Sequence, residues 1–352
     1  MLDSSIIERI RTSMPSAELA LADKMALVRA EYIETDLDDR LRASIDAVLR
    51  TLISRRASEE NRRRNETRAL VVVGEAGTGK TSSLDRMFRT HPALGDYGAL
   101  ASECPIARVV VPAPCTMKAL GVAILHALGY PLSRDLREHA IWTRVHETLQ
   151  TSGKVILHLD EMHNLTDKAN ALELDSIRKA LKTLLVSYDW PMGLVISGLP
   201  SLVPAMREID EVRRRGRFIR IPLLSMPTDS DLVDEALNRC CKIADIRVPD
   251  GFTEYAGSRL SHAGLQRYGI VVELIHEAIE AALLHRADTL DIAHFATAYN
   301  GRTGCGDRMN PFIAPDWPDI DATAVLVDEM PVEPVLPEDP KPRKRRARKS
   351  KA

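Results

Sequence analysis

Residues 69–81 read Ala-Leu-Val-Val-Val-Gly-Glu-Ala-Gly-Thr-Gly-Lys-Thr. The apolar run that opens this stretch predicts a buried strand, and a helical pattern over Thr81–Phe88 follows it directly. Glycines between a strand and a helix let backbone N–H groups curl around a phosphate without a Cβ in the way, and the helix N-terminus adds favourable partial charge. The stretch therefore predicts a phosphate-binding loop, against the alternative of a chance glycine-rich turn.

The loop has the spacing Gly-x-x-x-x-Gly-Lys-Thr, which is typical of proteins that bind ATP. We expect Lys80 to bridge the β- and γ-phosphates and the Thr81 hydroxyl to ligate Mg²⁺. The residues predicted to line the nucleotide are Gly74, Glu75, Ala76, Gly77, Thr78, Gly79, Lys80, Thr81 and Ser82.

Further short apolar runs alternate with helical stretches along the chain. Strands are predicted at 69–73, 107–111, 155–159, 194–196 and 218–223, with helices at 81–88, 117–128, 134–149 and 172–187 between them. Continuous Val/Ile/Leu runs that alternate with helices indicate an α/β fold, a parallel sheet covered on both faces. Beyond about residue 226 only helices are predicted, at 229–243, 253–262, 265–285 and 290–299.

These patterns divide the chain into predicted units. They are an N-terminal helical region at 1–65, an α/β core at 66–226, a helical second domain at 227–310, and a disordered tail at 311–352. The tail is acidic from Asp316 to Asp339 and basic from Lys341 to Lys351, so the formal net charge of −2 conceals an internal asymmetry. The basic end is a candidate DNA contact; shielding by the acidic stretch and docking of a partner are the alternatives.

The predicted strand at 155–159 ends in two carboxylates, Asp160 and Glu161, at the edge where active sites of parallel sheets open. We expect Asp160 to hold the water shell of the magnesium and Glu161 to orient the attacking water, which favours hydrolysis over a kinase reaction. The alternative is that the two acids only cap a loop.

Three further positions are candidates on topological grounds. Ser197 follows a strand where a polar side chain could sense the γ-phosphate, although a plain strand-ending serine is the alternative. The cluster Arg213-Arg214-Arg215-Gly216-Arg217 could reach a neighbouring subunit's ATP, with Arg215 and Arg217 as leading candidates; a solvated charged face is the alternative. Arg267, in Gly264-Leu-Gln-Arg, could return to the phosphates or lie on a helix surface.

Composition excludes several classes of protein. The five cysteines, Cys104, Cys115, Cys240, Cys241 and Cys305, form no CxxC pair, so a disulfide framework and a zinc site are not expected. The N-terminus has no signal-peptide pattern, and no apolar run approaches the ~20 residues of a membrane helix. We expect a cytoplasmic protein.

These motifs together resemble the AAA+ class, and within it the chain is similar to the TniB/TnsC family of transposition ATPases. The resemblance covers about residues 20 to 315 and rests on the phosphate loop, the acidic motif and four other segments. These are Arg29-Ala-Glu-Tyr-Ile, Val109-Val-Val-Pro-Ala-Pro-Cys-Thr-Met-Lys-Ala-Leu with its continuation to Pro131, Phe295-Ala-Thr-Ala-Tyr, and Asn310-Pro-Phe. Gly216 departs from the arginine-phenylalanine pairing that often carries the family's finger residue, which leaves the acting arginine open.

The resemblance implies a P-loop AAA+ domain with a five-stranded parallel sheet and a helical lid. It also implies an ATP-dependent homo-oligomer, ring or filament, on duplex DNA, which selects the target and recruits a DDE transposase, with or without a separate target-selection factor. Thr116 and Lys118 map onto the loop that faces DNA in this family; by themselves they are the first turn of a helix. The alternatives are an AAA+ loader or remodeller of another protein, and a nucleotide-gated scaffold with little turnover.

Overall fold

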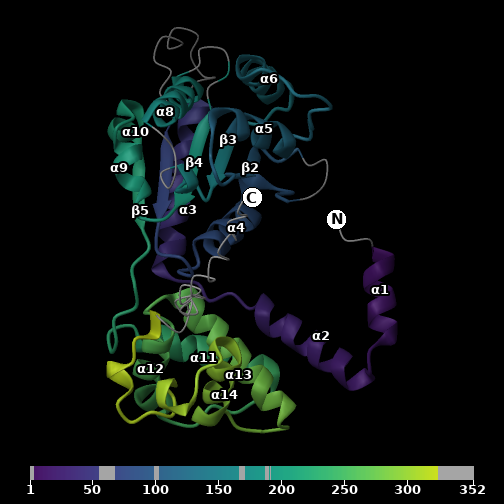
Figure 1. Cartoon of the computed structure of the whole chain (residues 1–352), viewed down its shortest axis with the longest axis vertical. Coiled ribbons are helices and arrows are strands. Elements are labelled where there is room, and N and C mark those ends of the chain that lie inside the picture. The colour runs from purple at the N-terminus through teal and green to yellow at the C-terminus, as the bar shows by residue number, and fades with distance from the viewer. Residues whose placement is uncertain are drawn as a thin grey trace, which may run out of the picture.

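The computed structural model describes residues 4–54, 68–98, 103–165, 171–186, 190 and 192–323. Within these ranges the centre of the larger unit is a parallel sheet in the strand order β2-β3-β4-β1-β5 (Figure 1). The strands are β1 (Ala69–Val73), β2 (Ile106–Val110), β3 (Ile156–Asp160), β4 (Gly193–Gly198) and β5 (Arg217–Arg220). The predicted α/β fold with a five-stranded parallel sheet is confirmed.

The order of the strands fixes where the functional motifs meet. The three central strands β1, β3 and β4 are buried along their whole length, as expected for apolar strands covered on both faces. Val73 lies beside Gly198, and Val110 lies beside Asp160, so the carboxyl ends of four strands share one edge. The phosphate loop starts at that edge, and Asp160, Glu161 and Ser197 lie at it.

Helices cover both faces of the sheet. The helices α3 (Asp36–Ser54) and α4 (Lys80–Thr90) contribute to one buried apolar cluster with β1 and β5. The opposite cluster takes its side chains from α5 (Met117–Ala127), α6 (Glu138–Thr151), α8 (Ala171–Val186), α9 (Leu202–Arg207) and α10 (Asp210–Arg215). A short 3-10 helix, η2 (Pro92–Leu94), follows α4.

A second unit, the lid, lies below the sheet in Figure 1 and has its own apolar core. Its helices are α11 (Ser230–Ala244), α12 (Phe252–Ala263), α13 (Tyr268–Leu284) and α14 (Ile292–Thr303). Two short 3-10 helices follow, η3 (Asp307–Met309) and η4 (Trp317–Asp319). Nothing in the structure tests the predicted unit boundaries at 65 and 226, which stay predictions.

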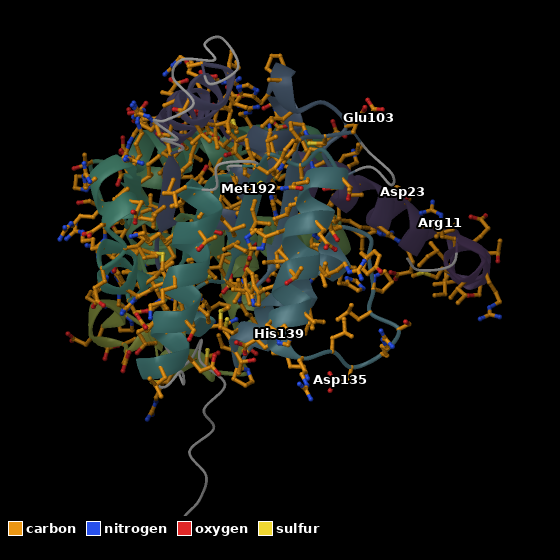
Figure 2. The ribbon with its side chains drawn as sticks, turned by 90° about the horizontal axis from the view of Figure 1, so that it is seen from above. Arg11, Asp23, Glu103, Asp135, His139 and Met192 are labelled. Carbon is orange, nitrogen blue, oxygen red and sulfur yellow. The ribbon has the colours of Figure 1, made fainter. Side chains whose placement is uncertain are left out.

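The N-terminal helices divide between the two units. Helix α2 (Ser16–Ala30) buries Met25 and Val28 in the apolar core of the lid, whereas α3 buries Leu41 and Ile45 against the sheet. Helix α1 (Ser4–Ser13) contacts α2 through an ion pair of Arg11 with Asp23, at the side of the molecule in Figure 2. The segment 31–35 therefore joins a helix of the lid to a helix of the core.

The chain continues to pack against the lid beyond residue 310, where the sequence suggested a tail without periodic structure. Phe312, Ala314 and Ile320 are buried. Arg259 donates to the backbone oxygen of Ala314 at 2.9 Å, and the ring Nε2 of His262 lies 2.9 Å from the oxygen of Ile320. These contacts join an irregular segment to α12, which helical periodicity cannot reveal. The predicted basic end, 341–351, lies outside the described residues.

Some element boundaries differ from the sequence predictions. β5 begins at Arg217 and ends before Pro222, because proline has no N–H to continue the ladder. Helix α13 begins at Tyr268 rather than 265, since Leu265 and Gln266 both have φ of 55° and cannot belong to a right-handed helix. None of the helices in the described ranges is long and apolar enough to cross a membrane.

Candidate nucleotide-binding site

The loop between β1 and α4 has a backbone that glycine alone adopts without strain. Gly77 and Gly79 have φ of 73° and 89°, and Gly79 caps the N-terminus of α4 in the left-handed conformation. A Cβ on Gly77 would lie 2.6 Å from Cγ1 of Ile270 in the lid. Thr78 closes the turn by donating to the oxygen of Glu75 at 2.8 Å. Ala76 is exposed at the outside of the loop, and Ser82 is exposed in the first turn of α4.

The ammonium of Lys80 is folded into this loop. Its Nζ donates to the oxygens of Gly74 at 2.9 Å and of Glu75 at 2.8 Å, and the residue is buried. Burial lowers the pKa of Lys80, although the carboxylates of Glu161 and Asp160 oppose that shift. A buried cation beside free N–H groups at a helix N-terminus is suited to an anion with several oxygens.

Thr81 and Asp160 face each other across the sheet edge. The Thr81 Oγ1 lies 3.5 Å from the Asp160 Oδ2. Within the described part of the chain, no group of three or more His, Cys, Asp or Glu could hold a metal by itself. One hydroxyl and one carboxylate fit Mg²⁺ that takes its other ligands from phosphates and water, which is how this ion is usually bound beside nucleotides.

Asp160 is held by three neighbours. Ser197 donates its hydroxyl to Oδ1 at 2.6 Å, the Glu161 N–H donates to the same oxygen at 3.1 Å, and Arg108 donates to Oδ2 at 2.8 Å. Burial alone would raise the pKa of Asp160, but the Ser197 hydroxyl and the Arg108 guanidinium outweigh it and hold that pKa below its ordinary value. The carboxylate is therefore ionised and fixed in place.

His158 lies two residues before Asp160 on β3 and joins this hydrogen-bond network. Its Nε2 is 2.9 Å from the Ser197 hydroxyl. Burial lowers the pKa of His158 to about 4, so the ring is neutral at pH 7. Because the Ser197 hydroxyl donates to Asp160, the neutral ring carries its proton on Nε2 and donates to Ser197.

Glu161 extends from the sheet edge in an unusual backbone conformation. Its φ is 57°, which is rare for a residue with a Cβ and turns its side chain out of the strand's alternation. Its side chain is 41% exposed, and the Oε2 lies 3.4 Å from the Nδ1 of His163. An exposed carboxylate on a fixed backbone beside the metal position is able to accept a proton from water.

The lid reaches the phosphate loop directly. The Ile270 N–H donates to the oxygen of Gly77 at 3.1 Å, and a Cβ on Gly269 would lie 2.5 Å from that same oxygen. Arg267 is the N-cap residue of α13, two residues before this contact, and its charge contributes to the lowered pKa of Lys80. The structure thus places Arg267 close to the phosphate loop, and its role toward the phosphates stays a prediction.

The predicted arginine cluster does not converge on the phosphate loop of its own chain. Arg214 and Arg215 lie in the last turn of α10, and Arg217 is the first residue of β5. Arg217 pairs with Leu70, four residues before Gly74, which places it about 13 Å from the loop at ~3.3 Å per strand residue. Its side chain donates to the oxygen of Ala43 on α3 at 3.3 Å.

Thr116 and Lys118 line a groove of about 780 Å³ between β2 and α5, together with Arg108 and exposed Val110. Thr116 is the N-cap of α5 and accepts the N–H of Ala119 at 3.1 Å. Lys118 forms an ion pair of 2.6 Å with Asp135, which lies at the rim of the molecule in Figure 2.

Sequence reasoning missed Arg108, His158 and His163. The signal for Arg108 and His158 was available: each is a polar residue within an apolar strand run, where a buried partner is required. Their partners, however, follow from the register of β2, β3 and β4, which the sequence does not specify.

The comparisons with known proteins agree with this architecture. The family model of an AAA domain matches residues 63–206. No curated protein matches the sequence. Among solved structures, the fold is similar to the Orc1 protein of Aeropyrum pernix in complex with DNA, with a TM-score of 0.57 and 15% identity. That similarity covers 81% of this chain and 70% of that one.

Two other archaeal structures show the same likeness. Cdc6p from Pyrobaculum aerophilum has a TM-score of 0.56 and 14% identity, over 78% of this chain and 70% of that chain. The Orc2 protein of Aeropyrum pernix, in ADPNP–ADP complexes, has a TM-score of 0.53 and 16% identity, over 76% and 69%. Residues 63–206 therefore match an AAA domain, and the α/β fold of the chain is similar to that of these Orc and Cdc6 proteins.

Proposed function

We propose that the protein is a Mg²⁺-dependent ATPase. The observation that carries this proposal is the convergence of Lys80, Thr81, Asp160 and Glu161 at one edge of the sheet, with Asp160 ionised by its neighbours. Lys80 would exchange the loop carbonyls for phosphate oxygens, and Thr81 and Asp160 would hold the metal. Magnesium, when bound, would neutralise phosphate charge.

Glu161 is the residue that would make the site hydrolytic. It would accept the proton of a water molecule in line with the γ-phosphate, while Asp160 stays ionised beside the metal. Ser197 would act through Asp160, whose carboxylate it fixes, as well as through any direct contact with the γ-phosphate. Arg267 would add positive charge from the lid.

Two variants test the ATPase. Lys80→Ala should abolish binding of a fluorescent ATP analogue at micromolar protein, whereas Glu161→Gln should bind it normally and release phosphate at least about a hundredfold more slowly. Glu161→Gln tests the base because it keeps the size of the side chain and removes its basicity. If Glu161→Gln hydrolyses ATP at the wild-type rate, the assignment of the base is wrong.

We further propose that the ATPase assembles on duplex DNA and regulates transposition, selecting the target and recruiting a DDE transposase. The resemblance of residues 20 to 315 to the TniB/TnsC family supports this, and the fold is similar to that of an Orc1 protein solved with DNA. An arginine of the 214–217 cluster would serve a neighbouring subunit's site, since about 13 Å separates Arg217 from its own loop.

Thr116 and Lys118 are the proposed DNA contacts. Phosphate contacts by one hydroxyl and one ammonium per subunit would carry no base specificity, so affinity would come from repetition and fall steeply with salt. Lys118 would exchange Asp135, an exposed partner, for a phosphate oxygen.

The DNA proposal is tested by sedimentation and electron microscopy with duplex DNA, with and without a slowly hydrolysed ATP analogue. Lys118→Ala should weaken assembly on DNA, whereas Lys179→Ala, which removes an exposed lysine paired with Asp175 on α8, should not. Assembly that needs ATP but no DNA would refute the DNA role and favour a loader of another protein.

A further inference from the structure

Arg108 is a cation built into the metal-binding edge of the site. It projects from β2, whose Val110 lies beside Asp160, onto the face of the sheet that α4 covers. Its Nη2 donates to the Asp160 Oδ2 at 2.8 Å, and its Nη1 lies 3.9 Å from the Asp85 Oδ1 on α4. Its Nε is buried without a hydrogen-bond partner among the described residues.

Arg108 occupies the one oxygen of Asp160 that a metal at Thr81 would use. Oδ1 already accepts from Ser197 and from the Glu161 N–H, so it points into the protein. Oδ2 faces both Thr81, at 3.5 Å, and Arg108, at 2.8 Å. A guanidinium and a divalent cation therefore meet the same lone pairs, and each lowers the affinity of the carboxylate for the other.

The surroundings give the guanidinium a second position. Asp85 offers another carboxylate, whose Oδ1 already lies 3.9 Å from the Arg108 Nη1, and the groove that Arg108 lines with Thr116 is open to solvent. The Arg108 side chain is 34% exposed, so leaving Asp160 does not bury it without a partner. A guanidinium in an ordinary structural ion pair has no second carboxylate or solvent-exposed position to move to.

We propose that Arg108 is an internal counter-ion of Asp160 that competes with Mg²⁺ and so sets the magnesium concentration at which nucleotide binds. This inference rests on the proposed ATP site. Without metal, Arg108 neutralises Asp160 and keeps the carboxylate oriented. When nucleotide arrives with its metal, the Arg108 guanidinium moves off Oδ2 toward Asp85 and the groove.

The test is the magnesium dependence of nucleotide affinity, measured as equilibrium binding of a fluorescent ADP analogue across a magnesium titration, with no turnover needed. Arg108→Met keeps the apolar stem and removes the charge, and it should lower the half-saturating magnesium concentration about tenfold, the scale of one charge-assisted hydrogen bond that is partly exposed. Arg108→Lys keeps the charge and should stay near the wild-type value.

Arg144→Met is the matched control. Arg144 is an arginine of α6, on the opposite face of the sheet from α4, and its Nε lies 3.7 Å from the Glu147 Oε2, so its removal should leave the magnesium midpoint unchanged. Thermal unfolding in chelator should show that each variant is folded, with Arg108→Met melting lower than wild type because Asp160 has lost its counter-ion.

The outcomes separate this inference from the proposed function. If wild type binds the analogue with no magnesium dependence, the proposed metal site itself fails. If wild type depends on magnesium and Arg108→Met has the same or a higher midpoint, Arg108 supports metal binding instead of competing with it, and only the counter-ion inference is overturned.

Discussion

Removing the Ser197 hydroxyl tests the network that fixes Asp160. In Ser197→Ala the carboxylate loses a buried hydrogen bond of 2.6 Å, and the ring of His158 loses its acceptor at 2.9 Å. The first loss costs about 1.5–3 kcal/mol, and an unpaired buried donor costs about 1–3 kcal/mol. Because both act through one atom they do not add fully, and we expect about 3 kcal/mol in the free energy of unfolding.

At an unfolding entropy of about 2.1 cal/mol/K per residue, that loss lowers the melting temperature of a 352-residue chain by about 4 °C, measured by circular dichroism in chelator without nucleotide. The midpoint magnesium concentration for nucleotide binding should rise as well, because Asp160 is no longer held. Thr253→Val is the control: it removes a hydroxyl–carboxylate bond of 2.8 Å to Asp234 in the lid. That variant should lose about 1 kcal/mol and keep the wild-type magnesium midpoint, since Asp234 is exposed.

A Ser197→Ala protein that melts within about 1 °C of wild type would refute the reasoning, because the loss would then be below about 1 kcal/mol. So would a magnesium midpoint equal to that of wild type. Either result would mean that Ser197 is a strand-ending serine whose contacts carry no net free energy.

Three other expectations concern the lid and the assembly. Gly269→Ala places a Cβ 2.5 Å from the oxygen of Gly77 and should weaken nucleotide binding about tenfold in the fluorescence assay; unchanged affinity would show that the lid contact is irrelevant. Burial lowers the pKa of His294, whose Nδ1 accepts the N–H of Asp291, the N-cap of α14, so stability present above its ordinary pKa is lost as the pH falls; His294→Asn should lose less between pH 7 and 5 in urea unfolding, and an equal loss would contradict this. Arg217→Ala, inactive alone, should recover ATPase activity when mixed with Lys80→Ala, because one interface then holds an intact site and an intact finger; no recovery at any ratio would exclude Arg217 as the trans residue.

The fold could be predicted because its decisive signals are local. Strands β1, β3 and β4 are continuous apolar runs, and each is buried throughout. The bounds predicted for β5 were wrong because it is an edge strand. Its Arg217 and Arg220 are exposed, so it lacks the apolar run that marks the other strands. The start of α13 was missed because nothing in the letters Leu265-Gln266 specifies a positive φ.

In the candidate site, too, local motifs could be predicted and long-range contacts could not. Gly74 to Thr81 and the pair Asp160-Glu161 could be predicted, because strand ends of a parallel sheet share an edge whatever the order of the strands. The contact of Arg108 with Asp160 depends on β2 lying next to β3 in one register, and the contact of Ile270 with Gly77 depends on where the lid docks. These are long-range facts that spacing along the chain does not contain.

Because α2 packs on the lid and α3 packs on the sheet, the N-terminal segment forms a second covalent connection between the two units. Helix α2 is anchored to the lid by Arg29 with Glu280 and by Lys24 with Asp245, while α3 is fixed to the sheet. Any rotation of one unit against the other must therefore be absorbed in residues 31–35 as well as in the strand-to-lid passage after 220. Since Tyr32 in that span lies under Arg86 of α4, the helix that begins at the phosphate loop, the same five residues that join the two units also contact the helix that would hold the phosphates of a nucleotide.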